Sequence, residues 1–113
     1  MGRWPNLDAM EMIELSAVSA MQQGGSPGPL SSLLKLRWSQ LRQQLAELAM
    51  DAVGSDALRW VTGRPLYDSL QLPASEEQLL SVMPRYLNYR AYTILGGTSE
   101  IQTTILARSM LGL

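Results

Sequence analysis

The 113-residue sequence contains no cysteine and no histidine. The absence of cysteine excludes disulfides, thiolate chemistry and cysteine metal sites, and the absence of histidine removes the commonest general base and zinc ligand. Much catalytic chemistry is thereby excluded, and we predict that the chain has no metal site.

Long hydrophobic runs and a strong charge of either sign are also missing. Hydrophobic residues make up 46% of the chain, yet no run approaches the roughly 20 apolar residues that span a bilayer. The start lacks the basic and apolar segments of a secretory signal. Nine basic and ten acidic residues give a net charge of −1, which offers no electrostatic footprint for nucleic acid. We expect a single cytoplasmic domain with no membrane span and no nucleic-acid partner.

The chain is instead rich in apolar residues at helical spacing. Asn6 is suited to cap a first helix, and Asp8 then lies in its first turn. Apolar residues follow both on and off one stripe: Met10, Ile13, Ala17 and Met21 on it, and Met12, Leu15 and Val18 beside it. A helix that is apolar on several sides needs several neighbours. We therefore expect the chain to associate, as a homo-oligomer or with a companion subunit.

A second, longer helix is predicted from Leu30 to Val53, after a loop at Gln22–Pro29 that is rich in glycine and proline. Apolar residues recur there at spacings of four and three, which predicts one packing seam. The seam consists of Leu34, Trp38, Leu41, Leu45, Leu48 and Ala52. The polar residues Lys35, Arg42, Gln43, Gln44 and Glu47 are interpreted as a solvated face. Gly54 ends the helix.

The region Ser55–Pro73 is interpreted as an ordered loop, since its glycine and prolines are interspersed with aromatic residues. Ser75-Glu-Glu-Gln78 has the spacing of a capping box and predicts a helix that Pro84 kinks or restarts. The carboxylate pairs Glu76–Glu77 and Asp8–Glu11 are interpreted as complements to helix dipoles and not as acid–base groups. No stretch has a strand pattern. The sequence thus predicts an all-α fold, an antiparallel bundle of three to four helices.

The last part of the chain is a glycine turn that leads into a helix. Gly96 and Gly97 allow backbone angles that other residues avoid, and Thr98 or Ser99 can cap the following helix. Ser99-Glu-Ile-Gln102 has capping-box spacing, so Gln102 can return a bond to the cap. Two interpretations are open: the free N–H groups at this positive helix end hold a phosphate or a polar cofactor edge, or the segment is only a tight turn with a good cap.

The segment Arg90–Leu113, with its core Thr93-Ile-Leu-Gly-Gly-Thr-Ser-Glu-Ile-Gln102, resembles the end of an acyl-CoA dehydrogenase. The helix between Ser31 and Gly54 falls where that family has its preceding long helix, so the resemblance covers most of the chain. It implies that residues 1–113 are a single partial domain, the C-terminal helical bundle of an FAD-dependent enzyme that dehydrogenates acyl-CoA thioesters. The family's N-terminal helical domain and middle β-domain have no counterpart in these residues.

The resemblance also implies cofactor-binding residues. Gly97, Thr98 and Glu100 match positions that border flavin adenine dinucleotide in the family. Asp51 and Gly54 fall near a helix end that approaches the flavin of a neighbouring subunit. The family often has glutamine followed by a glycine pair at that helix end, whereas this chain has serine in place of the second glycine.

No catalytic residue is expected in this chain. One large branch of the family carries its carboxylate base at the position that aligns with Gly96, and other branches place it on an earlier helix that these residues do not include. The isolated chain is therefore expected to be inactive, and only the complete enzyme would meet acyl-CoA and an electron-transfer partner. Two alternatives remain open: a helical interaction or oligomerisation module, and a structural bundle without a ligand.

Overall fold

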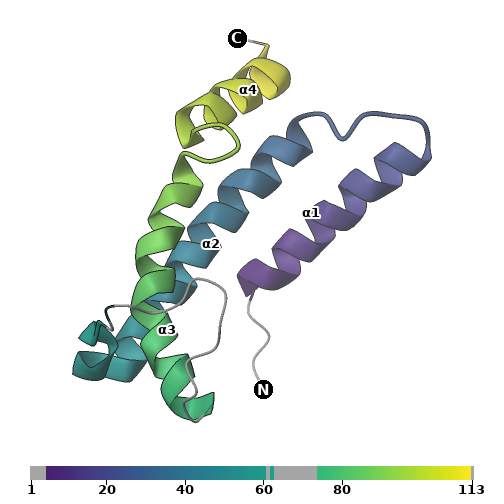
Figure 1. The fold of residues 1–113 in the computed structure, drawn as a ribbon. Helices are drawn as coiled ribbons and strands as arrows, with labels where there is room; N and C mark the ends of the chain where they lie inside the picture. Colours follow the sequence, from purple (N-terminus) through teal and green to yellow (C-terminus); the bar gives the residue numbers. More distant parts are fainter. Residues whose placement is uncertain (1–4, 61, 63–73, 113) are drawn as a thin grey trace. The chain divides into compact units, whose positions relative to one another are not determined.

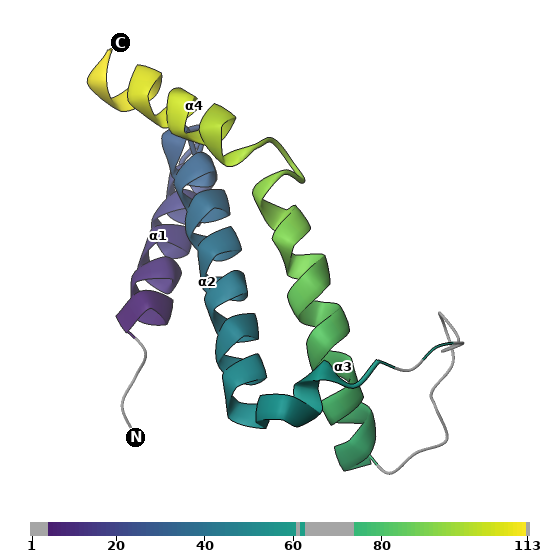
Figure 2. The same ribbon diagram turned by 90° about the vertical axis from the view of Figure 1, so that its left-hand side faces the viewer.

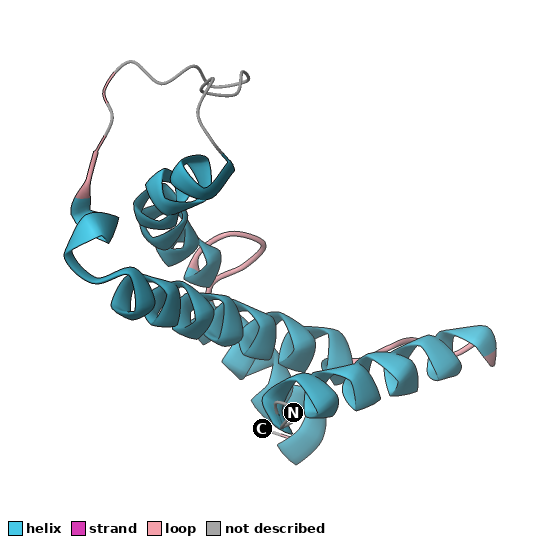
Figure 3. Ribbon diagram, turned by 90° about the horizontal axis from the view of Figure 1, so that it is seen from below, coloured by secondary structure: helices cyan, strands magenta, loops and turns pink. Residues whose placement is uncertain are grey.

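The structure is a computed structural model that describes residues 5–60, 62 and 74–112. These residues form helices and connecting turns, with no strand among them (Figures 1 and 3). The helices are α1 (Pro5–Gln22), α2 (Pro29–Val53), α3 (Ala74–Tyr89) and α4 (Ser99–Leu111), with two short 3-10 helices, η1 (Gly54–Leu58) and η2 (Arg90–Thr93). The prediction of an all-α fold is confirmed. Most of the predicted loop before α3 lies outside the described residues.

The chain divides into two compact units. The terminal unit consists of Met1–Leu41 and Tyr92–Leu113, and the central unit consists of Arg42–Ala91. The long helix α2 therefore contributes its first part to one unit and its last part to the other. That residues 1–113 form a single partial domain stays a prediction.

In the terminal unit, α1 leads through a loop into α2, which runs back alongside it (Figure 1). A proline opens each helix, at Pro5 and Pro29, because its fixed φ suits the first helical position and its missing N–H is not needed there. The sequence predicts Asn6 as the cap of α1, but Asn6 lies inside the helix, since Pro5 already begins it. The predicted loop is confirmed, with both helix boundaries within one residue of the expected positions.

The terminal unit leaves much apolar surface exposed. On α1 only Ala17 is buried. Met10 and Ile13 are half-buried. The other large apolar side chains of α1 are 44 to 64% exposed: Leu7, Met12, Leu15, Val18 and Met21. Helix α4 has no buried residue among its thirteen. Helix α1 therefore exposes apolar side chains that the described rest of the terminal unit does not cover, and the association of the chain stays a prediction.

The buried face of α2 differs from the predicted seam. Leu41 is buried, but Trp38, Leu45 and Leu48 are 36 to 48% exposed. Small residues are buried instead: Ser32, Ser39 and Ala46, which recur every seventh residue. At 3.6 residues per turn, they lie on the opposite side of the helix from most of the leucines. Leucine spacing predicts the helix and the burial of Leu41 correctly, but it misses the buried small residues on the other side of the helix. Small side chains there allow neighbouring backbone to approach closely.

In the central unit, the last part of α2 runs antiparallel to α3 (Figure 2). Gln43 Nε2 donates to the Tyr89 carbonyl at 3.1 Å, and Arg90 Nη1 donates to Glu47 Oε1 at 3.0 Å. The Arg42 guanidinium lies over the Tyr89 ring, 5.1 Å from its centroid. The interpretation of these polar α2 residues as a solvated face is wrong for Arg42 and Gln43, because their side chains are half-buried and contact Tyr89. Glu47 is exposed, as predicted, and also pairs with Arg90.

Helix α3 also packs against η1. Ala57 and Leu80 are buried there, and an ion pair joins Arg59 to Glu76 at 3.7 Å. Because α3 begins at Ala74, Ser75 lies inside the helix and is not its N-cap. The prediction that Ser75 opens the helix with a capping box is therefore wrong. The helix continues through the internal proline as one element. No helix in the described ranges has the length and hydrophobicity needed to cross a membrane.

Candidate cofactor-binding site

In the terminal unit, η2 fixes the start of the glycine turn against α2. The Ser39 hydroxyl lies 2.8 Å from the Lys35 carbonyl and 3.1 Å from the Tyr92 carbonyl, to which it can donate. The Tyr92 ring meets Trp38 edge-on, with ring centroids 4.7 Å apart. Ser39 is only 1% exposed. The sequence analysis did not single out Ser39, because an isolated serine in a leucine-rich helix does not indicate whether its side chain is buried.

The turn itself is built on two glycines in the left-handed region. Gly96 has φ of 68° and Gly97 has φ of 91°, angles that side-chain-bearing residues rarely adopt. Thr98 follows as the N-cap of α4, and its Oγ1 accepts a hydrogen bond from the Ile101 N–H at 3.3 Å. The sequence left Thr98 and Ser99 open as caps, and the structure selects Thr98.

Gln102 holds the turn in a way that the sequence did not predict. Its Nε2 donates to the Gly96 carbonyl at 3.1 Å. The predicted capping box, in which Gln102 returns a bond to the cap, is therefore wrong. A Cβ on Gly97 would lie 2.7 Å from Gln102 Nε2, whereas a Cβ on Gly96 would meet no atom within 4 Å. The backbone is therefore enclosed by Gln102 at Gly97 and open to approach at Gly96.

Glu100 is exposed in the first turn of α4. The pKa of its carboxyl is lowered from 4.5, first by a hydrogen bond from its own backbone N–H and then by one from the Thr98 hydroxyl. The Lys35 ammonium adds a weaker attraction, and desolvation opposes the shift. The Thr98 Oγ1 thus accepts from the Ile101 N–H, and its hydroxyl also contributes to the lowered pKa of Glu100. A ligand that needs a hydrogen bond from Thr98 would have to compete with Glu100.

The second predicted contact region lies in the central unit, where α2 ends and η1 begins. Gly54 has φ of 66°, and a Cβ there would meet no atom within 4 Å. Asp51 is exposed in the last turn of α2, a turn that contains no basic residue. An ionised carboxylate accepts hydrogen bonds but cannot donate them, unlike the glutamine that the resembled family often has there.

The described residues contain no group of three or more side chains suited to hold a metal ion. Gly96, the position that the family resemblance implied for a carboxylate base, is a glycine and has no side chain. The described turn therefore offers backbone groups, the Gln102 amide, the Thr98 hydroxyl and the Glu100 carboxylate, which can bind and orient a polar ligand.

The described residues are thus all-α, and a glycine turn that Thr98 caps leads into the last helix, α4. The sequence profile of the acyl-CoA dehydrogenase C-terminal domain matches residues 4–111. The chain belongs to the acyl-CoA dehydrogenase family.

Mycobacterial acyl-CoA dehydrogenases are among its relatives. IpdE1 of Mycobacterium tuberculosis is 33% identical over 112 residues, which cover 97% of this chain and 24% of IpdE1. IpdE1 of Mycolicibacterium smegmatis is 33% identical over 110 residues, which cover 97% of this chain and 23% of that protein. FadE34 of Mycobacterium tuberculosis is 37% identical over 90 residues, which cover 80% of this chain and 10% of FadE34. The chain thus spans about a quarter or less of each relative. No solved structure matches it significantly.

Proposed function

We propose that this chain is the C-terminal portion of an FAD-dependent acyl-CoA dehydrogenase, which carries out α,β-dehydrogenation of acyl-CoA thioesters. Its role there is to contribute flavin contacts and subunit association. The observation that carries the proposal is the glycine turn at Gly96–Gly97, which Thr98 and Gln102 hold in place at the start of α4. Side-chain bonds of this kind pre-organise backbone groups toward a ligand.

The residues of the turn fit a polar cofactor. The open backbone at Gly96 admits close approach, and the Gln102 amide oxygen is available as an acceptor beside it. We propose that Gly97, Thr98 and Glu100 border FAD, with Thr98 sharing its hydroxyl between Glu100 and the cofactor. Bound FAD would supply the ring that accepts the hydride.

At the end of α2, we propose that Asp51 and Gly54 approach the flavin of a neighbouring subunit. Gly54 leaves space for a ligand, since a Cβ there would meet nothing within 4 Å. Asp51 would accept a hydrogen bond from a donor on the cofactor, because its carboxylate cannot donate.

Catalysis would require protein outside this chain. Gly96 cannot abstract a proton, so a carboxylate base has to come from elsewhere in the complete enzyme. Acyl-CoA and an electron-transfer partner are proposed for that complete enzyme only, and the isolated chain is expected to be inactive. A cytoplasmic location stays a prediction from the sequence.

The test is complementation. The chain would be co-expressed with the remainder of an acyl-CoA dehydrogenase such as IpdE1, and the purified complex assayed for flavin absorbance and for its bleaching by acyl-CoA. We expect bound flavin with the native chain and much less with Gly97→Val. Thr103→Ala is the matched control, since the Thr103 hydroxyl bonds only within α4, to Ser99 O at 2.8 Å. Equal flavin content in both variants, with α4 still helical, would refute a cofactor role for the turn.

A second candidate function is a helical interaction or oligomerisation module without a catalytic role. It is favoured by the exposed apolar side chains of α1 and by the lack of any buried residue in α4. Sedimentation of the purified chain separates the two candidates when combined with the flavin assay. A stable colourless oligomer that never acquires flavin on complementation favours the module, and a flavin-bearing complex favours the enzyme portion.

A further inference from the structure

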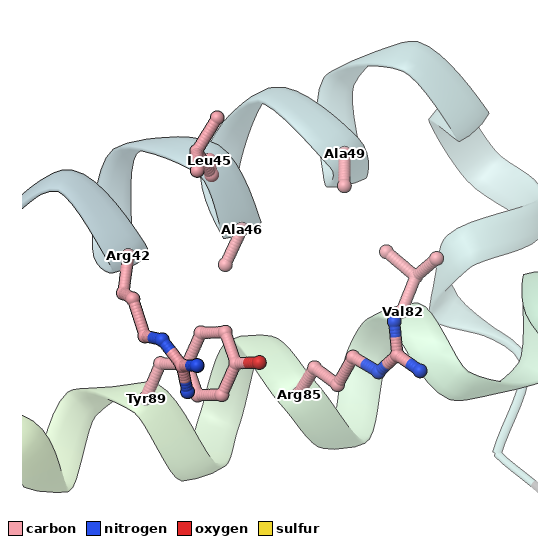
Figure 4. A pocket seen from close by; sticks show the side chains of 7 residues that line it. All are labelled: Arg42, Leu45, Ala46, Ala49, Val82, Arg85 and Tyr89. Atoms are coloured by element: carbon pink, nitrogen blue, oxygen red, sulfur yellow. The ribbon is translucent and has the colours of Figure 1, made fainter. Parts of the chain in front are cut away.

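The central unit contains a pocket of about 320 Å³ between the last part of α2 and α3 (Figure 4). Helix α2 contributes Arg42 and the apolar Leu45, Ala46 and Ala49, and α3 contributes Arg85, Tyr89 and the apolar Val82. None of these lining residues is acidic. The volume lies at the lower end of the roughly 300–1,000 Å³ that small-molecule sites occupy. Two positive charges thus share a small pocket with apolar side chains from both helices.

The arginines reach the pocket from different helices. Arg42 extends from α2 toward the Tyr89 ring, and Arg85 comes from α3, with the Tyr89 hydroxyl between them in the view of Figure 4. The Arg42 guanidinium is held 5.1 Å from the Tyr89 ring centroid, and the Tyr89 carbonyl is held by Gln43. Arg85 is exposed and forms no hydrogen bond or ion pair with any residue of the described ranges. One guanidinium is therefore pre-positioned, and the other can turn toward a ligand.

We propose that this pocket binds a small molecule with an oxyanion headgroup and a short apolar chain. The planar guanidinium fork matches the geometry of a carboxylate or phosphate. The apolar chain would lie against Ala46, Ala49 and Val82, where alanines leave room. A carboxylate and a phosphate monoester share this chemistry, and the experiment distinguishes them. The site is separate from the glycine turn and does not depend on flavin.

The test uses the full 113-residue chain labelled with ¹⁵N. Hexanoate and hexyl phosphate would be titrated separately, and the amide signals of Ala46, Ala49 and Tyr89 followed by NMR. We expect saturable shifts with at least one of them, and the tighter ligand identifies the headgroup. Inorganic phosphate and hexanol each carry only half of the proposed recognition, so both should bind at least roughly tenfold more weakly. Inorganic phosphate that binds equally well would show a non-specific ion contact and overturn the proposal.

Substitutions in the lining of the pocket test whether the ligand binds there. Arg85→Gln should weaken binding at least roughly tenfold without unfolding the chain, since Arg85 is exposed and one charge-assisted bond is lost. Ala49→Leu should weaken ligand binding because the larger side chain would fill the space that the apolar chain of the ligand occupies. The matched control is Arg37→Gln, because Arg37 is also exposed but lies on α2 and does not line the pocket. The proposal fails if neither ligand saturates, or if Arg85→Gln and Ala49→Leu bind as tightly as Arg37→Gln.

Discussion

The two glycine-containing segments that the family resemblance connects with flavin differ in how the surrounding chain holds them. At the start of α4, Thr98 caps the helix and Gln102 bonds to the carbonyl of Gly96. At the start of η1, Gly54 also has a positive φ, but the preceding N-cap, Val53, provides no side-chain bond. Side-chain hydrogen bonds thus stabilise the turn before α4, whereas the N-cap of η1 contributes none.

This difference shows that a left-handed glycine alone is weak evidence for a ligand site. Such a glycine ends many helices because it lacks a Cβ. What distinguishes the α4 turn is that the space beside Gly97 is used by a specific side chain, Gln102. A turn organised in this way has one backbone conformation to offer a ligand. Gly54 instead leaves open space and would gain its order from whatever packs against it.

The comparison can be tested most strongly with Gly97→Ala. The added Cβ would meet Gln102 Nε2 at 2.7 Å, and alanine would be strained at φ of 91°. We expect a loss of about 2–3 kcal/mol of unfolding free energy, from backbone strain plus the displaced Gln102 bond. Gly54→Ala suffers the backbone strain without a close contact, so it should lose about 1–2 kcal/mol. Urea denaturation followed by circular dichroism measures both, and equal losses would contradict the distinction between the turns.

The next largest effect is expected for Thr98→Val. Valine keeps the shape of threonine but loses the oxygen that accepts from Ile101 N–H. We expect a loss of about 1 kcal/mol, with faster amide exchange confined to the first turn of α4. Thr98→Ser retains the hydroxyl and serves as the control. If Thr98→Val changed only flavin retention in the complemented enzyme and left exchange unaltered, the cap assigned to Thr98 would be of no energetic consequence.

The fold could be predicted from sequence to a large extent. Apolar spacing and glycine–proline loops give the all-α class and place the loop and the long helix correctly. The buried small residues of α2 could not be predicted in this way, because exposed leucines such as Leu45 and Leu48 dominate the hydrophobic pattern, whereas Ser39 is almost fully buried. The burial of Ser39 depends on the Tyr92 carbonyl, 53 residues away in sequence. Local spacing does not report such a distant partner.

The candidate site was predictable in part as well. The glycines and Thr98 were visible as a turn and cap, since both follow from local backbone chemistry. The role of Gln102 was not, because the same spacing serves either a capping box or a bond back to the turn carbonyl. The choice depends on where Gly96 and Gly97 direct the backbone, which only the structure describes. Whether FAD binds there stays a prediction.

A smaller effect of opposite sign is expected at the other turn. Asp51 places a negative charge near the negative end of the α2 dipole, so Asp51→Asn should stabilise the chain by about 0.3–1 kcal/mol at low ionic strength. The gain should shrink with added salt, which screens exposed charges. Asp8→Asn is the matched control, because Asp8 lies in the first turn of α1 and its removal should destabilise. Thermal unfolding in low and high salt measures both, and a destabilised Asp51→Asn would indicate that Asp51 has a structural partner.

The smallest effect concerns pH at Glu100. Because the pKa of its carboxyl is lowered from 4.5 in the folded chain, unfolding raises it, and the unfolded state binds more protons in that range. The stabilisation is therefore fully present above about pH 4.5 and is lost as pH falls through the lower, folded pKa. Solvent screening keeps the effect small, since Glu100 is exposed. The difference in unfolding free energy between the native chain and Glu100→Gln should be constant near neutrality and shrink below pH 4.5. Thr98→Val removes the second cause of the lowered pKa, so the pH dependence contributed by Glu100 should weaken when Glu100→Gln is compared with Glu100 in the Thr98→Val variant. An unchanged pH dependence would show that the Thr98 hydroxyl does not bond to Glu100 and is available to a ligand.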